Sequence, residues 1–336
     1  MPPQAPWSPE RVRALSSAYW EACALHAAVQ TGLMAALTQA PASARELCAR
    51  LELDPRGLDI LLRALLVLGL LSLEGERYVL DPRAAPCLTP GTPTDMSNAI
   101  LHMADMVQDW AQLAQCVRQG RPAQRQDHHN PGPNPERQHF YRAMRDIARQ
   151  QAKGLAARLG LQPGQHLLDM GGGPGVYALT FSQEVPGLKA TVYDLPGAEP
   201  YFREEAANYP GVEVAFFAGD YLEDAALGGG PYQVAWLSQI LHSEGPDQCV
   251  AMLRKAAGAL VPGGELWVQE FVVTVPGHPF SGLFGLNMLV NTQRGQSYTR
   301  EELLDMLGQA GLEGAEYVGS TKEGGPAGLV RGRRPH

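Results

Sequence analysis

The sequence has little positive charge and no long apolar run, and these shortages exclude two classes of protein. Lysine and arginine number 27 against 35 aspartates and glutamates, which gives a formal net charge of −8 over 336 residues. Because a nucleic-acid-binding protein needs a basic face, this balance argues against nucleic acid as a partner. The longest apolar stretch, residues 58–73, contains Asp59 and Arg63 and is too short to span a bilayer. We therefore expect neither nucleic acid nor membrane as a partner.

Cysteine is also scarce, and its spacing matches no common metal or disulfide framework. The five cysteines are scattered, with no Cys-x-x-Cys pair and no histidine at zinc-finger spacing. The amino-terminal residues show no basic segment followed by an apolar one, as a secretory signal would. We therefore expect a reduced, cytoplasmic protein without a metal. His128 and His129 lie in a proline-rich stretch, and we interpret them as solvated loop residues.

Apolar residues are plentiful, at 45% of the chain, which is enough for a sizeable core. Residues 10–90 show helical spacing, a turn at Asp54-Pro55, a further helix and a short strand pair around Glu74-Gly75. This order predicts a winged-helix-like domain over residues 1–95, which would serve either DNA binding in a regulator or dimerisation. Residues 1–110 carry eight basic against twelve acidic residues, which favours dimerisation. A helix predicted at residues 24–37 is apolar on much of its surface, so we expect a homodimer.

After residue 160 the pattern changes to alternating strands and helices. This alternation is typical of an α/β fold with a doubly wound sheet, whose ligands lie at the carboxyl ends of the strands. Residues 96–160 are predicted to be helical and to join this core, so that the catalytic domain spans 96–336. Five strands and a closing hairpin are predicted at residues 166–170, 190–195, 212–219, 232–241 and 265–273, and at 314–321 with 327–333.

Glycines crowd the turn after the first of these strands. Residues 169–175 are Asp-Met-Gly-Gly-Gly-Pro-Gly, a strand–turn–helix unit in which the backbone can approach a ligand closely. The dinucleotide-binding pattern Gly-x-Gly-x-x-Gly fails when it starts at Gly171, because Val176 stands where its third glycine belongs. A variant of the pattern that ends in alanine is satisfied by Gly173-x-Gly175-x-x-Ala178. The glycines alone therefore leave an NAD-dependent dehydrogenase open as an alternative.

Acidic residues near the glycines narrow this choice. Asp169 lies two residues before the first glycine, and Asp194 closes the second strand, where a carboxylate can accept both ribose hydroxyls. Asp220 follows the third strand, where it could meet an adenine edge. Pro174 removes one N–H group from the loop, which weakens the case for a diphosphate. A ligand with a sulfonium and no phosphate suits this acidic surrounding better.

In combination, these motifs resemble those of S-adenosylmethionine-dependent methyltransferases. Asp-x-Gly-x-Gly-x-Gly is followed by Tyr-Asp-Leu-Pro, by Gly-Asp and by His242 after the fourth strand. More narrowly, the chain resembles the small-molecule O-methyltransferases of plants and bacterial natural-product pathways, which carry a winged-helix-like dimerisation domain. The resemblance implies a Rossmann-like class I methyltransferase sheet, S-adenosyl-L-methionine as cofactor and a small-molecule acceptor, with a hydroxyl oxygen favoured. It implies cofactor contacts at Asp169, Gly171, Gly173, Gly175, Asp194, Leu195, Gly219, Asp220, Tyr221 and Ser238.

The resemblance also implies a catalytic role for His242. Its segment, Leu-His-Ser-Glu, keeps the histidine of the family's Leu-His-Asp-Trp, and Cys249 keeps the expected spacing. In the family this histidine is the general base that takes the proton of the acceptor hydroxyl, a role that suits imidazole near neutral pH. Glu270 falls where the family places a carboxylate that orients the histidine. The alternative is a histidine that only caps the end of the strand.

Two departures from the family pattern bear on the acceptor. Ser243 and Glu244 replace the Asp-Trp pair, and Ser297 stands where a second orienting acid is expected. They leave open a carbon, nitrogen or sulfur acceptor, which would depend less on a base than a hydroxyl does. Apolar and amide side chains are expected to line the acceptor pocket: Met106, Phe140, Met144, Met288 and Asn291. Packing in the core would explain Met288 equally well.

Overall fold

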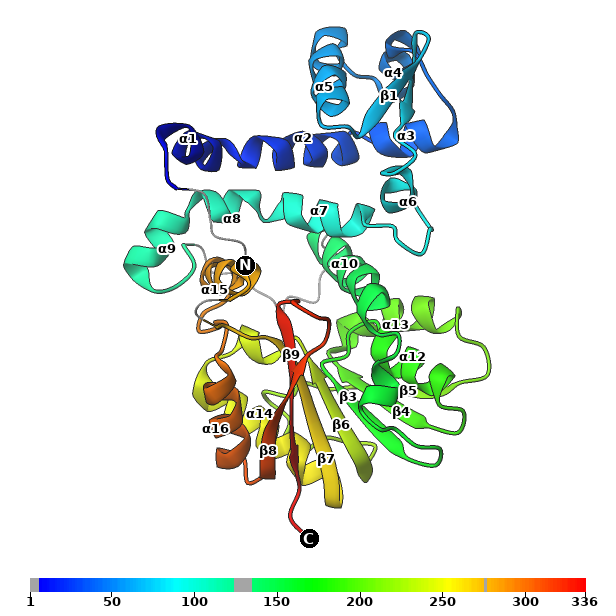
Figure 1. The fold of residues 1–336 in the computed structure, drawn as a ribbon. Helices are drawn as coiled ribbons and strands as arrows, with labels where there is room; N and C mark the ends of the chain where they lie inside the picture. Colours follow the sequence, from blue (N-terminus) through cyan, green and yellow to red (C-terminus); the bar gives the residue numbers. More distant parts are fainter. Residues whose placement is uncertain (1–5, 124–134, 275–276) are drawn as a thin grey trace. The chain divides into compact units, whose positions relative to one another are not determined.

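The computed structural model describes residues 6–123, 135–274 and 277–336. Figure 1 shows the chain, which divides into two compact units, Met1–Asp105 and Met106–His336. Residues 96–105 thus group with the first unit, and the domain bounds 1–95 and 96–336 stay a prediction. Among the described residues, no helix combines the length and apolar character needed to cross a membrane. The histidine pair at 128 and 129 lies outside the described residues.

The first unit consists of helices and one small hairpin. The antiparallel hairpin pairs β1 (Leu71–Glu74) with β2 (Arg77–Leu80). A single core made by side chains of α3, α4 and α5 holds the unit together. The helices are α1 (Pro9–Ser17), α2 (Tyr19–Gln30), α3 (Leu33–Gln39), α4 (Ala44–Leu51), α5 (Pro55–Val67), α6 (Ala85–Leu88) and α7 (Ser97–Asp105).

Local sequence determines where these helices begin. Ser43 and Glu46 form a reciprocal capping box at the start of α4, in which the Ser43 N–H donates to the Glu46 carboxylate at 2.7 Å. Asp54 caps α5 by accepting the N–H of Gly57 at 2.9 Å, immediately before Pro55. The turn predicted at Asp54-Pro55 is therefore the N-cap of α5, and the predicted order of helices followed by a hairpin is present.

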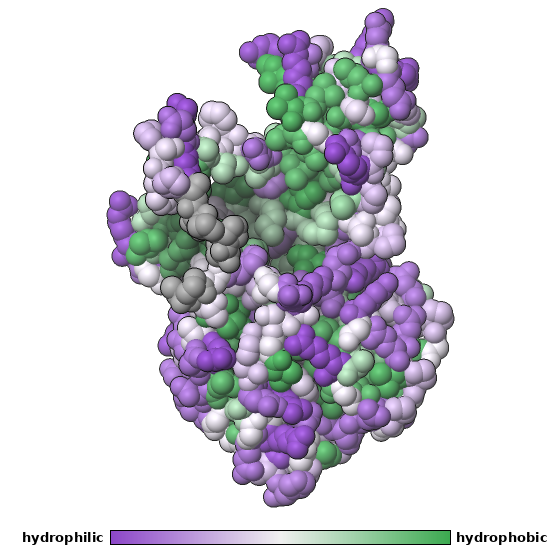
Figure 2. Space-filling view, in the orientation of Figure 1, coloured by the Kyte–Doolittle hydropathy of each residue, from purple (hydrophilic) through white to green (hydrophobic). Residues whose placement is uncertain are grey.

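The single apolar helix predicted at residues 24–37 is wrong. Gly32 adopts φ +73° and divides the segment into α2 and α3, and the apolar side chains of α3 are buried in the unit's own core. In Figure 2 apolar residues gather on the visible face of the first unit, whereas the visible face of the second is mostly hydrophilic. Several exposed large apolar side chains of this unit lie earlier in the chain, around α1 and the start of α2: Trp7, Val12, Leu15, Tyr19 and Trp20. Others lie on α5, β1 and α7: Ile60, Val67, Leu73 and Met103.

The second unit is built on a seven-stranded sheet with the order β5-β4-β3-β6-β7-β9-β8. The first five strands in this order are parallel, β9 is antiparallel to β7, and β8 is antiparallel to β9. The predicted strands and closing hairpin are therefore confirmed. Their bounds are β3 (His166–Met170), β4 (Lys189–Asp194), β5 (Glu213–Ala218), β6 (Tyr232–Ser238), β7 (Leu260–Phe271), β8 (Glu313–Ser320) and β9 (Ala327–Arg333).

Helices cover both faces of this sheet (Figure 1). Successive side chains of a strand point to opposite faces, so Leu167 joins the core under α11 and α12 while Leu168 joins the core under α14 and α16. The helices are α8 (Val107–Ala111), α9 (Leu113–Gln119), α10 (Pro135–Gln151), α11 (Leu155–Arg158), α12 (Val176–Glu184), α13 (Glu199–Ala206), α14 (Pro246–Ala259), α15 (Pro279–Asn291) and α16 (Arg300–Gln309), with 3-10 helices η1 (Pro196–Ala198) and η2 (Leu241–Ser243).

The register of the parallel strands brings the predicted site residues to one edge. Met170 pairs with Leu237, and Ser238 pairs with Gln269, so the residues that follow β3 and β6 lie beside the carboxyl end of β7. Asp194 ends β4 at the same edge. Polar residues that are scattered in the sequence are therefore neighbours at the edge where such sheets bind their ligands.

Candidate active site

His242 lies in the short 3-10 helix η2, directly after β6. The strand ends three residues earlier than predicted because Gln239 adopts φ +59°, in the left-handed region that non-glycine residues rarely occupy. The Gln239 N–H still donates to the carbonyl of Gln269 in β7 at 2.9 Å, so the turn remains attached to the sheet. Backbone strain of this kind is concentrated at functional sites in proteins.

Glu270 holds both the ring and the backbone of His242. Its carboxylate is 2% exposed, and Oε2 lies 2.8 Å from the imidazole Nδ1. Oε1 accepts the N–H groups of Leu241 at 2.9 Å and of His242 at 3.3 Å. Because an ionised carboxylate only accepts, Nδ1 carries a proton, and in the neutral ring the lone pair lies on Nε2.

Aromatic side chains enclose the rest of the imidazole. The ring of Phe284, from α15, meets it edge-on with centroids 4.8 Å apart, and Phe271 lies parallel to it at 6.4 Å. No described residue forms a hydrogen bond with Nε2. The structure therefore presents Nε2 as a free proton acceptor beside an apolar wall.

The glycine turn after β3 packs tightly against the protein itself. A Cβ at Gly172 would lie 2.6 Å from the Asp169 carboxyl group, so that position has no room for a side chain. At Gly171 a Cβ would meet Ile240, and at Gly175 it would meet Phe202. Only at Gly173, with φ +53°, does a Cβ meet nothing within 4 Å. Most of these glycines therefore serve the internal packing of the turn, and Gly173 faces open space.

Asp169 is buried beneath this turn. One carboxylate oxygen, Oδ2, accepts the N–H of Ala178 at 3.3 Å, while Oδ1 has no hydrogen-bond partner among the described residues. Burial raises the pKa of Asp169 to about 7, and the nearby Asp194 adds to the rise. A cationic ligand would favour the ionised form of this carboxyl group.

Asp194 joins the end of β4 to the glycine turn. Its Oδ2 accepts the Gly173 N–H at 2.7 Å and its Oδ1 accepts the Leu195 N–H at 2.7 Å. Burial raises its pKa to about 6 despite these two bonds. Each oxygen can accept a further hydrogen bond, as recognition of a ribose requires.

The remaining predicted cofactor residues follow β5 and β6. Gly219 donates its N–H to the Asp194 carbonyl at 2.9 Å, and Asp220 accepts the Leu222 N–H at 2.8 Å. Tyr221 is half-buried and packs on the core beneath α14 and α16, and burial raises its pKa. Ser238 is half-buried at the carboxyl end of β6.

Two residues at this edge were not among the predicted cofactor contacts. Gln239 has both side-chain amide atoms buried without a hydrogen-bond partner among the described residues, which is unusual for a buried polar group. The ring of Tyr141, from α10, stacks on the ring of Tyr201 with centroids 4.7 Å apart. Burial raises the pKa of Tyr141, and the charge of Asp194 raises it further. Its neighbour Phe140, which was predicted to line the acceptor pocket, is 42% exposed.

A cationic, hydroxyl-bearing cofactor fits these features. The unpaired amide of Gln239 and the free oxygen of Asp169 offer unused hydrogen-bonding groups, and Asp194 has acceptor capacity to spare. The carboxyl groups of Asp169 and Asp194 both contact the turn, which suits a sulfonium better than a diphosphate. In the part of the chain that the structure describes, no cluster of metal-ligating side chains is present.

Among the residues predicted for the acceptor pocket, those of α15 lie beside α8. Trp110 donates its indole N–H to Asn287 Oδ1 at 2.9 Å, and Asn291 donates to the same oxygen at 3.0 Å. These two bonds fix the orientation of the Asn287 amide. The NH2 group of Asn287 has no acceptor among the described residues. Met106 lies 3.7 Å from the Asn291 amide nitrogen. Phe284, which contacts His242, lies three residues before Asn287 on the same face of α15.

Other predicted pocket residues lie differently. Met288 is 6% exposed on α15, which favours packing as its role. Met144 is half-buried on α10. Ser297 has a buried hydroxyl without a partner among the described residues, and it lies against Gly285 of α15. Position 297, where the family pattern has a second acid to orient the histidine, therefore supplies no carboxylate in this chain.

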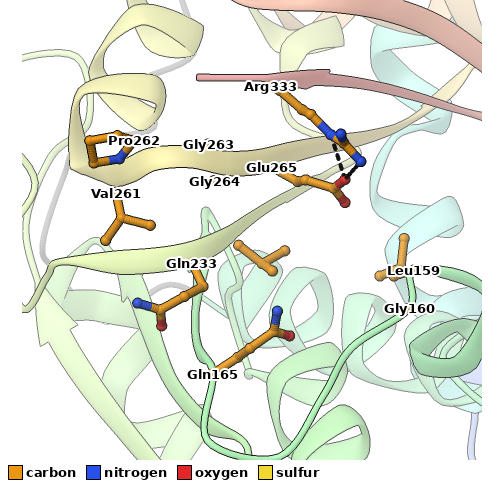
Figure 3. A pocket seen from close by; sticks show the side chains of 11 residues that line it. Leu159, Gly160, Gln165, Gln233, Val261, Pro262, Gly263, Gly264, Glu265 and Arg333 are labelled. Carbon is orange, nitrogen blue, oxygen red and sulfur yellow. Dashed lines mark hydrogen bonds and ion pairs between the residues drawn. The ribbon is translucent and has the colours of Figure 1, made fainter. Parts of the chain in front are cut away.

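A cavity of about 390 Å³ lies elsewhere, at the amino ends of the parallel strands (Figure 3). Several of its polar groups have partners: the amide oxygen of Gln233 accepts the His166 N–H at 2.7 Å, and Arg333 pairs with Glu265 at 2.8 Å. Because open α/β sheets bind ligands at the opposite edge, we place the active site at the carboxyl ends.

Comparison with known proteins agrees with this geometry. Residues 110–313 match the model of an O-methyltransferase domain, and residues 14–90 match an O-methyltransferase dimerisation domain. The chain belongs to the O-methyltransferase family. The methyltransferase is 30% identical over 318 residues to 3-hydroxy-5-methyl-1-naphthoate 3-O-methyltransferase of Streptomyces sahachiroi. The aligned residues cover 90% of this chain and 89% of the relative.

Further similarities extend to another chemistry and to the fold. The methyltransferase is 30% identical over 220 residues to the N,N-dimethyltransferase OxyT of Streptomyces rimosus, covering 62% of this chain and 64% of the relative. The crystal structure of human N-acetylserotonin methyltransferase in complex with SAM shares its fold, with a TM-score of 0.85, 22% identity and full coverage of both chains. The predicted fold class is thus confirmed.

The enzyme class follows from the family. The methyltransferase transfers a methyl group from S-adenosylmethionine to a small-molecule acceptor, as the motifs predicted. Its first unit contains the matched dimerisation domain. The NAD-dependent dehydrogenase and the DNA-binding regulator, both considered from the sequence, are not supported.

Proposed function

We propose that the acceptor atom is a hydroxyl oxygen and that His242 is its general base. The observation that carries this proposal is the pairing of Nδ1 with the buried Glu270 carboxylate at 2.8 Å, which leaves Nε2 free. A histidine that merely capped the end of β6 would not need a buried acid on its ring. General-base catalysis of this type contributes roughly 10²–10⁴-fold to the rate.

The residues of the chain would act in a simple order. S-adenosylmethionine supplies an electrophilic methyl group on a sulfonium. His242 Nε2 would take the proton of the acceptor hydroxyl as the oxygen bonds to the methyl carbon and the carbon–sulfur bond breaks, which releases S-adenosylhomocysteine. The Glu270 carboxylate would stabilise the resulting imidazolium. Phe271 and Phe284 keep water from the ring. Alignment of the acceptor with the methyl donor lowers the activation barrier by about 7–11 kcal/mol, which is more than the base contributes.

For the cofactor, we propose that Asp194 accepts the ribose hydroxyls and that Asp169 provides negative charge beneath the glycine turn. Gly171, Gly173 and Gly175 shape the turn, with Gly173 at its open side. Further contacts are proposed at the ends of β4, β5 and β6, with two residues added from the structure: Leu195, Gly219, Asp220, Tyr221, Ser238, Gln239 and Tyr141.

For the acceptor, we propose a flat, hydroxylated aromatic molecule. Support comes from the phenylalanine rings beside His242 and from the unused NH2 group of Asn287, which could donate to a carbonyl or carboxylate on the acceptor. The name of the Streptomyces sahachiroi relative, which methylates a hydroxynaphthoate, is consistent with this class. Met106 and Asn291 complete this wall in the proposal.

An acceptor screen tests the proposal directly. The protein is incubated with S-adenosylmethionine labelled on the methyl group and with hydroxynaphthoates, hydroxyindoles and their amino analogues, and the products are analysed by mass and by the carbon chemical shift of the new methyl group. A methoxy product supports the proposal. Exclusive formation of an N-methyl or C-methyl product contradicts it.

The second candidate is a nitrogen, carbon or sulfur acceptor with the same cofactor. Ser243 and Ser297 stand where the family has acids, and OxyT acts on nitrogen. A neutral amine carries its own lone pair and needs no base before it attacks. His242→Ala would then reduce turnover by less than about tenfold, which separates the two candidates.

We further propose that the protein is a homodimer assembled through the first unit, with domains at 1–95 and 96–336. The match to a dimerisation domain and the exposed apolar residues around α1 support this proposal. A reducing compartment such as the cytoplasm is consistent with the five unpaired cysteines.

A further inference from the structure

A buried tyrosine supports the turn that carries His242. Tyr298 precedes α16, and its side chain is 1% exposed. Its hydroxyl donates to the carbonyl oxygen of Glu244 at 2.5 Å. Burial raises the pKa of this hydroxyl, so it remains a protonated donor. Because Glu244 immediately follows η2, the bond fixes the end of the turn.

The thiol of Cys249 fixes the beginning of the same turn. It donates to the Leu241 carbonyl at 3.1 Å and lies 3.5 Å from the Tyr298 hydroxyl oxygen. Burial raises its pKa to about 12, so the thiol also stays protonated. The carbonyls on both sides of His242 are therefore held from the helix side, while Glu270 holds the N–H groups from the sheet side.

Tyr298 is itself well anchored. Its carbonyl accepts the Val273 N–H at 2.9 Å, and Thr299 forms a bridge with Val273 and caps α16. The loop before it presses on the same turn, since a Cβ at Gly295 would lie 2.3 Å from the His242 carbonyl oxygen. A rigid segment thus contacts the backbone of the turn at several points.

We propose that Tyr298 is a positioning residue for methyl transfer, whose hydroxyl sets the direction of the His242 ring by fixing the backbone of η2. The inference rests on the proposed function, because Tyr298 acts through His242. It also gives a physical meaning to the departure at Ser297, whose hydroxyl contacts no described partner. In the family pattern an acid at position 297 helps to orient the histidine. Here the adjacent Tyr298 supports His242 instead, through the backbone of the turn at η2.

The chain offers a matched control for the removal of this hydroxyl. Tyr232 is fully buried in the same core, and its hydroxyl donates to the carbonyl of Gly228 at 2.6 Å. It lies at the amino end of β6, at the opposite edge of the sheet from His242. Tyr298→Phe and Tyr232→Phe therefore lose the same kind of bond and keep the same ring packing.

The first measurement needs no acceptor. Nitrogen NMR of isotope-labelled histidines reports the protonation and hydrogen bonding of each ring, and His242→Gln identifies the signal of residue 242. We expect the His242 Nδ1 signal to shift or broaden in Tyr298→Phe and to stay as in the wild type in Tyr232→Phe. An unchanged His242 signal in Tyr298→Phe overturns the inference, whatever the reaction is.

The second measurement is single-turnover methyl transfer to the acceptor found in the screen. Tyr298→Phe should lower the single-turnover rate constant by roughly tenfold or more, since a misplacement of about 1 Å can cost about 10²-fold, with the affinity for S-adenosylmethionine unchanged. Tyr232→Phe should retain the wild-type rate constant. In the His242→Ala background, Tyr298→Phe should cause no further loss.

The outcomes separate the two proposals. If His242→Ala lowers the rate and Tyr298→Phe does not, the general base stands and the positioning role is overturned. If His242→Ala does not lower the rate, the general base is wrong and the positioning role falls with it. An equal loss in both tyrosine variants also overturns the positioning role, because it shows only a stability effect.

Discussion

The carboxylate of Asp194 accepts the backbone N–H of Gly173 at 2.7 Å, so the acid that ends β4 is bonded to the one glycine of the turn that faces open space. These residues are 21 positions apart in the chain: Gly173 lies in the turn after β3, and Asp194 ends the neighbouring parallel strand β4. The bond fixes the distance between the proposed ribose acceptor and the turn. Loss of the carboxylate should therefore affect both the cofactor contact and the shape of the turn.

Asp194→Ala should weaken the binding of S-adenosylmethionine. A hydrogen bond to a charged group contributes about 1.5–3 kcal/mol, so we expect a loss of roughly 10-fold to 150-fold in affinity. Titration calorimetry measures it, with Glu213→Gln, an exposed acid at the start of β5, as control. Unchanged affinity in Asp194→Ala would exclude the ribose assignment.

The raised pKa of Asp169 predicts the pH dependence of stability. Its pKa is about 7 in the folded protein against 3.8 as the ordinary value, so the folded state binds this proton more tightly than the unfolded state. The ligand-free protein should lose stability as pH rises from about 4 to about 7. Thermal unfolding across this range should show the decline, and Asp169→Asn should reduce its slope. A slope equal to that of the wild type in the variant would contradict the burial argument.

Asn287 should determine how well the acceptor is held. Its NH2 group has no described acceptor, while its oxygen is fixed by Trp110 and Asn291. Asn287→Asp keeps the size and removes the donor, so the KM for an acceptor with a carbonyl or carboxylate should rise by roughly tenfold, from a net hydrogen bond of about 1–1.5 kcal/mol. Steady-state kinetics test this, and an acceptor analogue without that group should show no such rise. Equal effects on both molecules would rule out a direct contact.

The exposed apolar residues around α1 should form the dimer interface. Trp20→Glu places a charge on a side chain that is 65% exposed, and we expect light scattering to change from twice the 36.3 kDa chain mass to the chain mass. Val67→Glu, at an 89% exposed position on α5, should leave the dimer intact. A wild-type protein that scatters as a single chain at micromolar concentration would contradict the homodimer.

Strand and helix periodicity was enough to predict the seven strands of the sheet and the edge at which the site lies. Alternation between strands and helices is a local property, and the parallel topology then brings Asp169, Asp194 and Glu270 to one edge. Glu270 could be predicted only through the family resemblance, because its partner His242 is 28 residues away in the sequence.

Other features depend on contacts that no short window of sequence contains. The apolar residues of 24–37 look continuous, but Gly32 adopts a left-handed conformation that separates two helices. The end of β6 continues an apolar pattern, and the turn at Gln239 appears only in the backbone angles. Tyr141 and Phe140 are equally plausible on a helical wheel, and only the packing against Tyr201 distinguishes them.

The account depends most on His242 as a base toward a hydroxyl. The decisive measurement is single-turnover methyl transfer by the wild type and His242→Ala, with the folded fraction of each sample determined. His166→Ala, which removes a ring bonded to Thr191 at the far edge of the sheet, is the control. We predict a roughly 10²–10⁴-fold loss in His242→Ala with unchanged cofactor affinity. A loss smaller than about tenfold would contradict the account.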